Sequence, residues 1–285
     1  MDVRIVADSA ANLLRMEGVD FVSVPLTIQV GGRAYRDTPE LRVSELLREL
    51  DASDGPTGSA CPGVGDWLDA FGDGNEIFVL TVTGGLSGSF QSAAIAAREY
   101  MQEHPDRHVE VMDSLSAGPQ IALLAERFAA MARAGIPFSE ACVRIRVYRK
   151  RTQLAFLCPS LDNFARNGRV SPALAKLVTM LHVHILGRAS AEGTLEPLNK
   201  CRGRDRGMAQ LWKNIKAAGY AGGRVRIHHT ENEAGASELR RTILAEYPGS
   251  DVQLGENRGL CAYYAERGGL LVGYEIDPSR GNGHG

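Results

Sequence analysis

Cysteine is scarce and scattered in this 285-residue sequence. The number of cysteines is odd, and no two of them form a C-x-x-C pair. This spacing argues against a disulfide framework and a zinc knuckle and favours a reducing compartment, so we expect a cytoplasmic protein. The five cysteines are Cys61, Cys142, Cys158, Cys201 and Cys261.

Long apolar runs are missing from the sequence as well. None approaches the ~18 residues of a membrane-spanning helix, so we expect no transmembrane segment. The first six residues lead directly into a strand pattern. They lack the basic start and apolar core of a signal peptide, and none is expected.

A strong net charge is the third absence. The 32 basic and 34 acidic side chains leave a formal charge of −2, so no global field favours nucleic acid or an anionic membrane. Two basic clusters, at 144–151 and 202–206, lie among apolar residues at helical spacing. We interpret them as solvated helix faces, with an electrostatic docking patch as the alternative.

One unit recurs through the first half of the chain: an apolar strand ends in a polar or glycine-rich loop, and a helix follows. This alternation predicts an α/β fold with mostly parallel sheets. Ligands of such sheets bind beyond the carboxyl ends of the strands, so the loops are candidate site segments. The units are a strand at 3–7 followed by Asp8-Ser9, a strand at 76–82 followed by the segment 83–89, and a strand at 109–112 followed by Asp113-Ser114.

The second half of the chain, after a basic helix that ends near Arg151, also alternates strands and helices. We interpret it as a second α/β domain. The predicted divisions are an N-terminal domain at 1–150, a C-terminal domain at 151–276, and a tail at 277–285 with the composition of a disordered end.

The segment from Gly84 to Ser89 follows a predicted strand and precedes a predicted helix, as phosphate-binding loops do. It fits neither the G-x-G-x-x-G nor the Walker pattern. Its backbone N–H groups and small hydroxyls suit one modest anion, a carboxylate as well as a phosphate. Ordinary turn chemistry is the alternative.

Two residues are conceivable nucleophiles. Ser87 lies in a run that is one residue off the G-x-S-x-G pattern, but no histidine stands in a context that would complete a hydrolase site. Cys61 precedes Pro62 in the turn-rich segment 57–63, which we expect to be a loop with Pro62 in the first turn of the next helix. No partner residue is defined for Cys61. An acyl hydrolase or transferase that uses Ser87 or Cys61 is kept as an alternative function.

A histidine pair and an arginine are further candidates for ligand binding. His182 and His184 would share one face of a strand, but no Asp, Glu or Cys stands nearby at ligand spacing, so we expect no metal. Arg169 follows Gly168 at the end of a short predicted helix. There it could cap helix carbonyls or reach an anion.

Taken in order, several motifs between residue 3 and about residue 276 resemble those of the DegV family. Each motif is weak by itself, and the ordered set is what carries the resemblance. The motifs are Asp8-Ser9-Ala10-Ala11-Asn12-Leu13, Val24-Pro25-Leu26, the segment 57–62, Leu86-Ser87-Gly88-Ser89-Phe90-Gln91-Ser92-Ala93, Asp113-Ser114 followed by Gly118, Asn167-Gly168-Arg169-Val170-Ser171, and Gly268-Gly269-Leu270-Leu271-Val272-Gly273-Tyr274.

The resemblance implies two α/β domains that hold a long-chain fatty acid between them without catalysis and without a cofactor. It also implies an acyl tail in an apolar tunnel and a carboxylate near the strand-end loops. Some relatives present the bound acid to a separate fatty-acid kinase, so a kinase is an expected partner. The physics agrees: small hydroxyls and helix N-termini suit a carboxylate, and each buried methylene contributes about 0.8 kcal/mol.

The resemblance also assigns ligand-binding residues, position by position. Where the family usually has a serine pair, Gly84 replaces one hydroxyl, and Tyr264 replaces a histidine. Glu266 and Arg267 alter the surface that would be presented to a kinase, so the alternatives include a chain without a kinase and a sensor of another amphipathic acid. The expected ligand-binding residues are Thr57, Ser59, Thr83, Gly84, Ser87, Arg169 and Tyr264.

Overall fold

The structure, a computed structural model, describes residues 3–170, 183–277 and 279. Its first layer is a four-stranded parallel sheet, sheet A, with the order β2-β1-β6-β7. The two central strands are almost entirely apolar because helices cover both faces of the sheet. The strands are β1 (Val3–Asp8), β2 (Asp20–Val24), β6 (Glu76–Thr81) and β7 (His108–Asp113).

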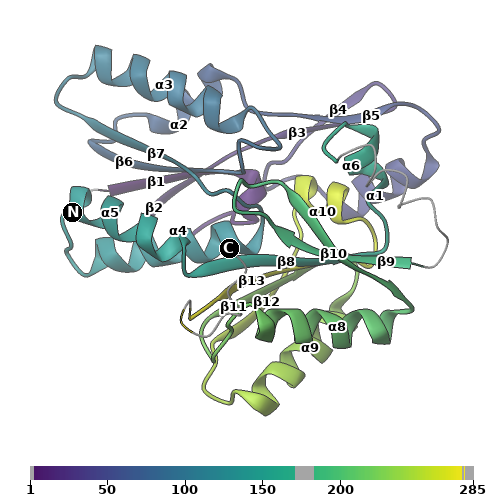
Figure 1. Ribbon diagram of the computed structural model, residues 1–285. Helices are drawn as coiled ribbons and strands as arrows, with labels where there is room; N and C mark the ends of the chain where they lie inside the picture. The colour runs from purple at the N-terminus through teal and green to yellow at the C-terminus, as the bar shows by residue number, and fades with distance from the viewer. Residues whose placement is uncertain (1–2, 171–182, 278, 280–285) are drawn as a thin grey trace.

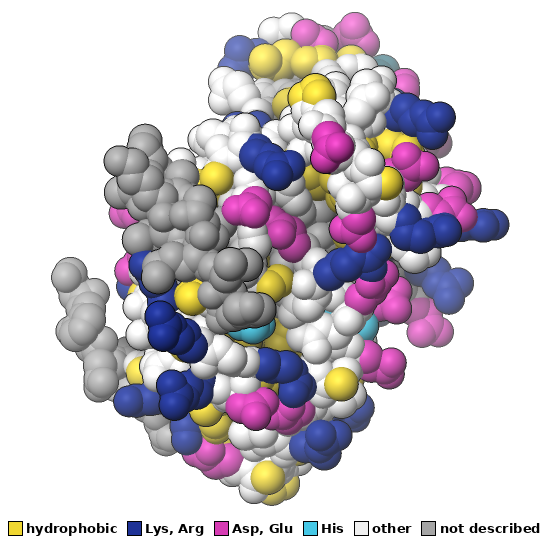
Figure 2. Space-filling view, turned by 90° about the vertical axis from the view of Figure 1, so that its right-hand side faces the viewer, with side chains coloured by type: hydrophobic (Ala, Val, Ile, Leu, Met, Phe, Trp, Pro, Cys, Tyr) yellow, Lys and Arg dark blue, Asp and Glu magenta, His cyan; other side chains and the backbone are white. Residues whose placement is uncertain are grey.

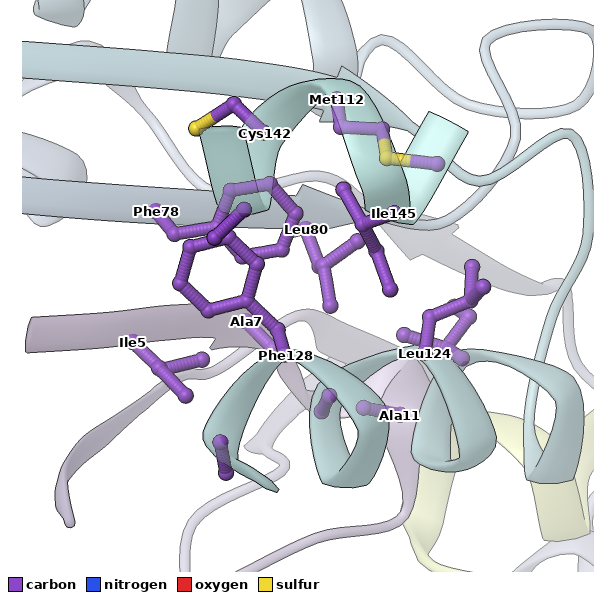
Figure 3. Close-up of a cluster of buried hydrophobic side chains, with 14 of the residues drawn as sticks. Ile5, Ala7, Ala11, Phe78, Leu80, Met112, Leu124, Phe128, Cys142 and Ile145 are labelled. Atoms are coloured by element: carbon purple, nitrogen blue, oxygen red, sulfur yellow. The ribbon is translucent and has the colours of Figure 1, made fainter. Parts of the chain in front are cut away.

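Helices α2 and α3 lie on one face of sheet A, and α4 and α5 lie on the other (Figure 1). The core on the second face is centred on Phe78 of β6 and Phe128 of α4, whose rings stack at 3.8 Å between centroids (Figure 3). The bounds are α2 (Val64–Phe71), α3 (Ser89–Glu103), α4 (Pro119–Arg133) and α5 (Phe138–Arg149); a 3-10 turn, η1 (Ser9–Ala11), follows β1.

Sheet C is built from the second half of the chain, in the order β10-β9-β8-β13-β11-β12. The α/β class is as predicted, but this sheet is mixed rather than mostly parallel. The last strand, β13, inserts between β8 and β11 and runs antiparallel to both. Among the described strands of sheet C, only β11 and β12 therefore pair in parallel. The strands are β8 (Thr152–Cys158), β9 (Val183–Ala189), β10 (Leu195–Arg202), β11 (Val225–His229), β12 (Val252–Glu256) and β13 (Leu270–Glu275).

Helix α4 lies between sheets A and C, while α8 (Arg204–Ala217) and α9 (Glu233–Glu246) cover the outer face of sheet C (Figure 1). The start of α4 lies so close to β13 that a Cβ atom at Gly273 would be 2.5 Å from the carbonyl carbon of Pro119. Further along α4, Glu126 forms an ion pair with the buried Arg226 of β11 at 2.6 Å. The two halves of the chain therefore share one helix as their common wall.

A small antiparallel sheet, β4-β3-β5, stands beside the two large ones. Its hairpin turns at Gly31 and Gly32, both with positive φ, a backbone conformation that glycine adopts readily. The expected loop at 57–63 is wrong in part, because residues 57–60 form strand β5, whose backbone pairs with β3. Pro62 also precedes the next helix, which starts after Gly63, instead of lying in its first turn. The bounds are β3 (Thr27–Val30), β4 (Arg33–Arg36), β5 (Thr57–Ala60) and the neighbouring α1 (Val43–Ala52).

Within the part that the structure describes, no helix has both the length and the apolar character needed to cross a membrane. Basic and acidic side chains are intermixed on the face drawn in Figure 2. The domain boundary near residue 150 and the cytoplasmic location stay predictions. Most of the tail predicted to be disordered, and His182, lie outside the described residues.

Candidate functional site

A mostly apolar cavity of about 280 Å³ lies where the three sheets and helix α10 (Gly259–Ala265) meet. Its floor belongs to sheet C: Leu154, Phe156 and Cys158 alternate along β8, and Leu271 of β13 joins them. The intervening Ala155 and Leu157 point the other way, into the core under α8 and α9. Strand β8 is therefore apolar on both faces, one packed against helices and one open to the cavity.

Helix α10 forms one wall of the cavity, and Asp37 fixes where that helix begins. The buried carboxylate of Asp37 accepts hydrogen bonds from the N–H groups of Gly259 and Leu260, both at 2.9 Å. Burial raises the pKa of Asp37, and these hydrogen bonds and the nearby Arg258 oppose the rise. A carboxylate at a helix N-terminus complements the helix dipole, so Asp37 orients the turn that carries Tyr264.

The polar end of the cavity contains a pair of hydroxyls from different elements. Ser59 Oγ of β5 lies 2.7 Å from Tyr264 Oη of α10, and both residues line the cavity. The Tyr264 ring stacks on Phe164 of α6 (Asp162–Arg166) at 4.4 Å between centroids. Stacking holds the ring while the hydroxyl stays at the cavity wall. The pair can donate hydrogen bonds to a carboxylate placed between the two oxygens.

A second hydroxyl pair lies beside the first one but outside the cavity. Thr57 Oγ1 is 2.9 Å from Tyr263 Oη, which also accepts a hydrogen bond from Asn167 Nδ2 at 2.7 Å. Thr57 and Tyr263 line a separate, more polar pocket of about 300 Å³ together with Asn163 and other residues. Of the two hydroxyl residues that the sequence singled out on this segment, Ser59 is the one at the apolar cavity.

The loop after β6 brings Ser87 to the cavity. Ser87 Oγ accepts a hydrogen bond from the N–H of Ser89 at 3.2 Å, at the start of the 15-residue helix α3. Thr83 is buried, and its hydroxyl accepts a hydrogen bond from Gly85 N at 3.1 Å. This bond stabilises the loop on its buried side. Gly84 is exposed, and its N–H donates to Asp113 Oδ2. The positive end of the α3 dipole and the Ser87 hydroxyl suit an anion.

Beneath this loop, Asp8 at the end of β1 holds the loop in place. Its Oδ2 accepts hydrogen bonds from Val82 N at 2.8 Å and from Ser89 Oγ at 2.6 Å. Its Oδ1 is buried without a hydrogen-bond partner among the described residues. Burial raises the pKa of Asp8 to about 7; the two hydrogen bonds oppose this rise, and the charge of Asp113 adds to it. Asp8 therefore anchors both ends of the segment that carries Ser87.

Four of the seven expected binding residues line the cavity: Ser59, Ser87, Arg169 and Tyr264. Arg169 is half-buried, and its guanidinium forms no ion pair with the residues that the structure describes. The other three, Thr57, Thr83 and Gly84, lie around the cavity without lining it.

Several lining residues were missed by reasoning on polar motifs, because they are apolar. Phe156 and Leu271 on the floor lie in apolar strand segments and Phe164 on the wall lies in a short helix, and no polar group marked any of the three as a binding residue. Cys61 also lines the cavity and is exposed.

The two adjacent buried histidines of β11 are hydrogen-bonded to residues other than the two conceivable nucleophiles. His228 Nδ1 accepts from Asn12 Nδ2 at 2.9 Å, and burial lowers the pKa of His228 to about 3. His229 Nδ1 accepts from the N–H of Asn232 at 3.3 Å. Within the described ranges no histidine is hydrogen-bonded to Ser87 or Cys61, and no group of three potential metal ligands occurs.

Comparison with known proteins gives a consistent result over nearly the full chain. The model of the family described as "Uncharacterised protein, DegV family" matches residues 2–275. A DegV domain-containing protein of Streptococcus pneumoniae is 38% identical over 281 residues, which cover 97% of this chain and all of that protein.

Two solved structures are similar to this chain in both sequence and fold. One is a DegV family protein from Eubacterium eligens loaded with heptadecanoic acid, 41% identical with a TM-score of 0.94, where 96% of this chain and 100% of that chain are covered. The other is the fatty acid kinase (Fak) B3 protein of Streptococcus pneumoniae loaded with linoleic acid, 38% identical with a TM-score of 0.95 over 97% and 100% of the two chains.

Proposed function

The chain belongs to the DegV family, and we propose that it binds one long-chain fatty acid non-covalently and presents the carboxyl group to a fatty-acid kinase. The observation that carries this proposal is the cavity itself, apolar over most of its wall with hydroxyls at one end. Two relatives with 38% and 41% identity hold fatty acids, which supports the same ligand class here.

The acyl tail would lie over the floor of sheet C, with the carboxylate at Ser59, Ser87 and Tyr264. Each methylene moved from water to this apolar wall contributes about 0.8 kcal/mol, so the tail supplies most of the affinity. The hydroxyls and the start of helix α3 supply orientation. Arg169, which also lines the cavity, supplies the positive charge that a carboxylate prefers.

Presentation to a kinase requires the carboxyl group to be reachable from solvent. The polar end of the cavity meets that requirement, because Cys61 and Gly88 at this end are exposed. The similarity to a protein of a fatty acid kinase system supports a kinase as the partner. Neither Glu266 nor Arg267 lines the cavity: Glu266 accepts a hydrogen bond from Asn163 N at 3.2 Å, and Arg267 forms ion pairs with Asp51 and Glu231.

The chain acts in this proposal as a carrier and not as a catalyst. Neither Ser87 nor Cys61 has a histidine partner among the described residues, so general-base activation is not provided for either one. Ser87 instead accepts a hydrogen bond from the backbone, which leaves its own proton free to donate to a carboxylate.

Mass spectrometry of lipids extracted from the purified protein, followed by titration of the delipidated protein with palmitic, stearic and oleic acids, tests the ligand. A co-purifying or tightly bound fatty acid is expected. A different amphipathic acid in the extract, with no fatty acid bound on titration, would establish the sensor alternative instead. Adding a fatty-acid kinase and ATP to the loaded protein tests presentation, and acyl phosphate is the expected product.

Two matched variants test where the carboxylate lies. Ser59 and Thr57 are two residues apart on β5, and each lies within hydrogen-bond distance of a tyrosine of α10, but only Ser59 lines the cavity. Ser59→Ala should weaken fatty-acid binding about tenfold, the value of one hydrogen bond to a charged group. Thr57→Ala should leave affinity within about twofold of the original by the same reasoning. Equal losses in the two variants would contradict this placement.

A further inference from the structure

The floor of the cavity contains an unusual contact between a large residue and a glycine. Phe156 of β8 lies directly opposite Gly187 of β9 in the antiparallel ladder, so both point to the same face of sheet C. That face is the cavity floor, because Phe156 lines the cavity together with Leu271, its opposite neighbour on β13. The row across the sheet at this level is therefore a glycine, a phenylalanine and a leucine.

The Phe156 ring lies flat over Gly187 instead of standing upright in the cavity. A Cβ atom at Gly187 would lie 2.3 Å from Phe156 Cζ and 2.9 Å from Cε1, so the tip of the ring takes the place of the missing side chain. The ring is almost fully buried, with 2% of its surface exposed. Any side chain at position 187 would force the ring away from β9, and the cavity is the space above it.

We propose that Phe156, laid flat over Gly187, sets the depth of the acyl cavity and thereby the longest acyl chain that the protein accepts. The inference rests on the proposed fatty-acid function. Phe156 is the largest side chain on the floor, and its neighbours along β8 are the smaller Leu154 and Cys158. Room for the tail above β8 and β9 therefore depends more on this ring than on any other floor residue.

The two residues make opposite predictions about chain length. Phe156→Leu removes the outer ring atoms and opens the space over Gly187, so longer chains gain contacts. Gly187→Ala pushes the ring into the cavity, so longer chains lose room. Each methylene that gains or loses a buried position changes affinity about fourfold, which corresponds to about 0.8 kcal/mol.

The experiment measures the affinity of each delipidated protein for palmitic and arachidic acids and compares the ratio of the two. Phe156→Leu should raise the ratio of arachidic to palmitic affinity at least fourfold relative to the unaltered protein, and Gly187→Ala should lower it. Leu157→Ala is the matched control, since Leu157 is the next residue on β8 and faces the helices, and its ratio should stay within about twofold.

The Gly187→Ala substitution creates a second steric clash besides the one with Phe156, because the new Cβ would also lie 2.6 Å from the carbonyl oxygen of Glu196 on β10. If that protein does not fold, Phe156→Leu decides by itself. A Phe156→Leu protein that binds palmitic acid with an unchanged or lowered ratio overturns the inference and leaves the proposed function standing. An unaltered protein that binds no fatty acid overturns the proposed function, and the inference falls with it.

Discussion

Asp8 is the residue whose protonation should couple the stability of this protein to pH. Its carboxylate is fully buried and holds both ends of the loop that carries Ser87. The exchange Asp8→Asn keeps an oxygen that accepts from Val82 N and Ser89 Oγ and places an amide nitrogen where Oδ1 has no partner among the described residues. The variant therefore resembles the protonated carboxyl group and cannot ionise.

The size of the effect follows from the pKa of Asp8, about 7 in the folded protein against an ordinary value of 3.8. Below about pH 4 the group is protonated in both the folded and the unfolded state. As pH rises towards 7 the unfolded chain releases this proton and the folded chain keeps it, so the free energy of unfolding falls. At about 1.4 kcal/mol for each pH unit between these two values, the loss is about 4 kcal/mol and is complete above pH 7.

Urea unfolding at a series of pH values, followed by the fluorescence of the two buried tryptophans, Trp67 and Trp212, measures this loss. The free energy of unfolding of Asp8→Asn, minus that of the unaltered protein, should rise by about 4 kcal/mol between about pH 4 and pH 8. Asp73→Asn, at a side chain that is 91% exposed, controls for the amide exchange itself. A difference for Asp8→Asn that stays constant with pH would refute the reasoning, because the carboxyl group would then ionise equally in both states.

Two further variants test carboxylates that connect the first half of the chain to the second. Asp37→Ala removes the buried carboxylate from the start of α10 and should lower the free energy of unfolding by about 3 kcal/mol in denaturant titrations, with a smaller loss for Asp37→Asn. Glu126→Ala leaves the guanidinium of Arg226, a side chain only 5% exposed, without its bidentate partner on α4. Calorimetry should then give a loss of about 3 kcal/mol, and a loss below about 1 kcal/mol would mean that Asp251 suffices as partner.

The strand-end loops are the part of the site that the sequence predicted best. Neighbouring parallel strands end at the same edge of a sheet, so the loops after β1, β6 and β7 had to lie close together. The hydrogen bonds from Val82 N to Asp8 and from Gly84 N to Asp113 show that they do. The mixed order of sheet C was not predictable in this way. Alternation of strands and helices gives no sign that β13 returns from α10 to lie between β8 and β11.

The apolar half of the site could not be predicted from the residue pattern of its strands. Residues 154–158 of β8 are all apolar, and the alternation that normally separates a buried face from an open one is therefore absent. One face, with Ala155 and Leu157, packs on helices, while the other, with Phe156, borders a space for a ligand. A strand that borders an apolar ligand needs the same side chains as one that borders a core. The contact that lets the Phe156 ring lie over β9 is with Gly187 on another strand, and the residue pattern of β8 gives no sign of that contact.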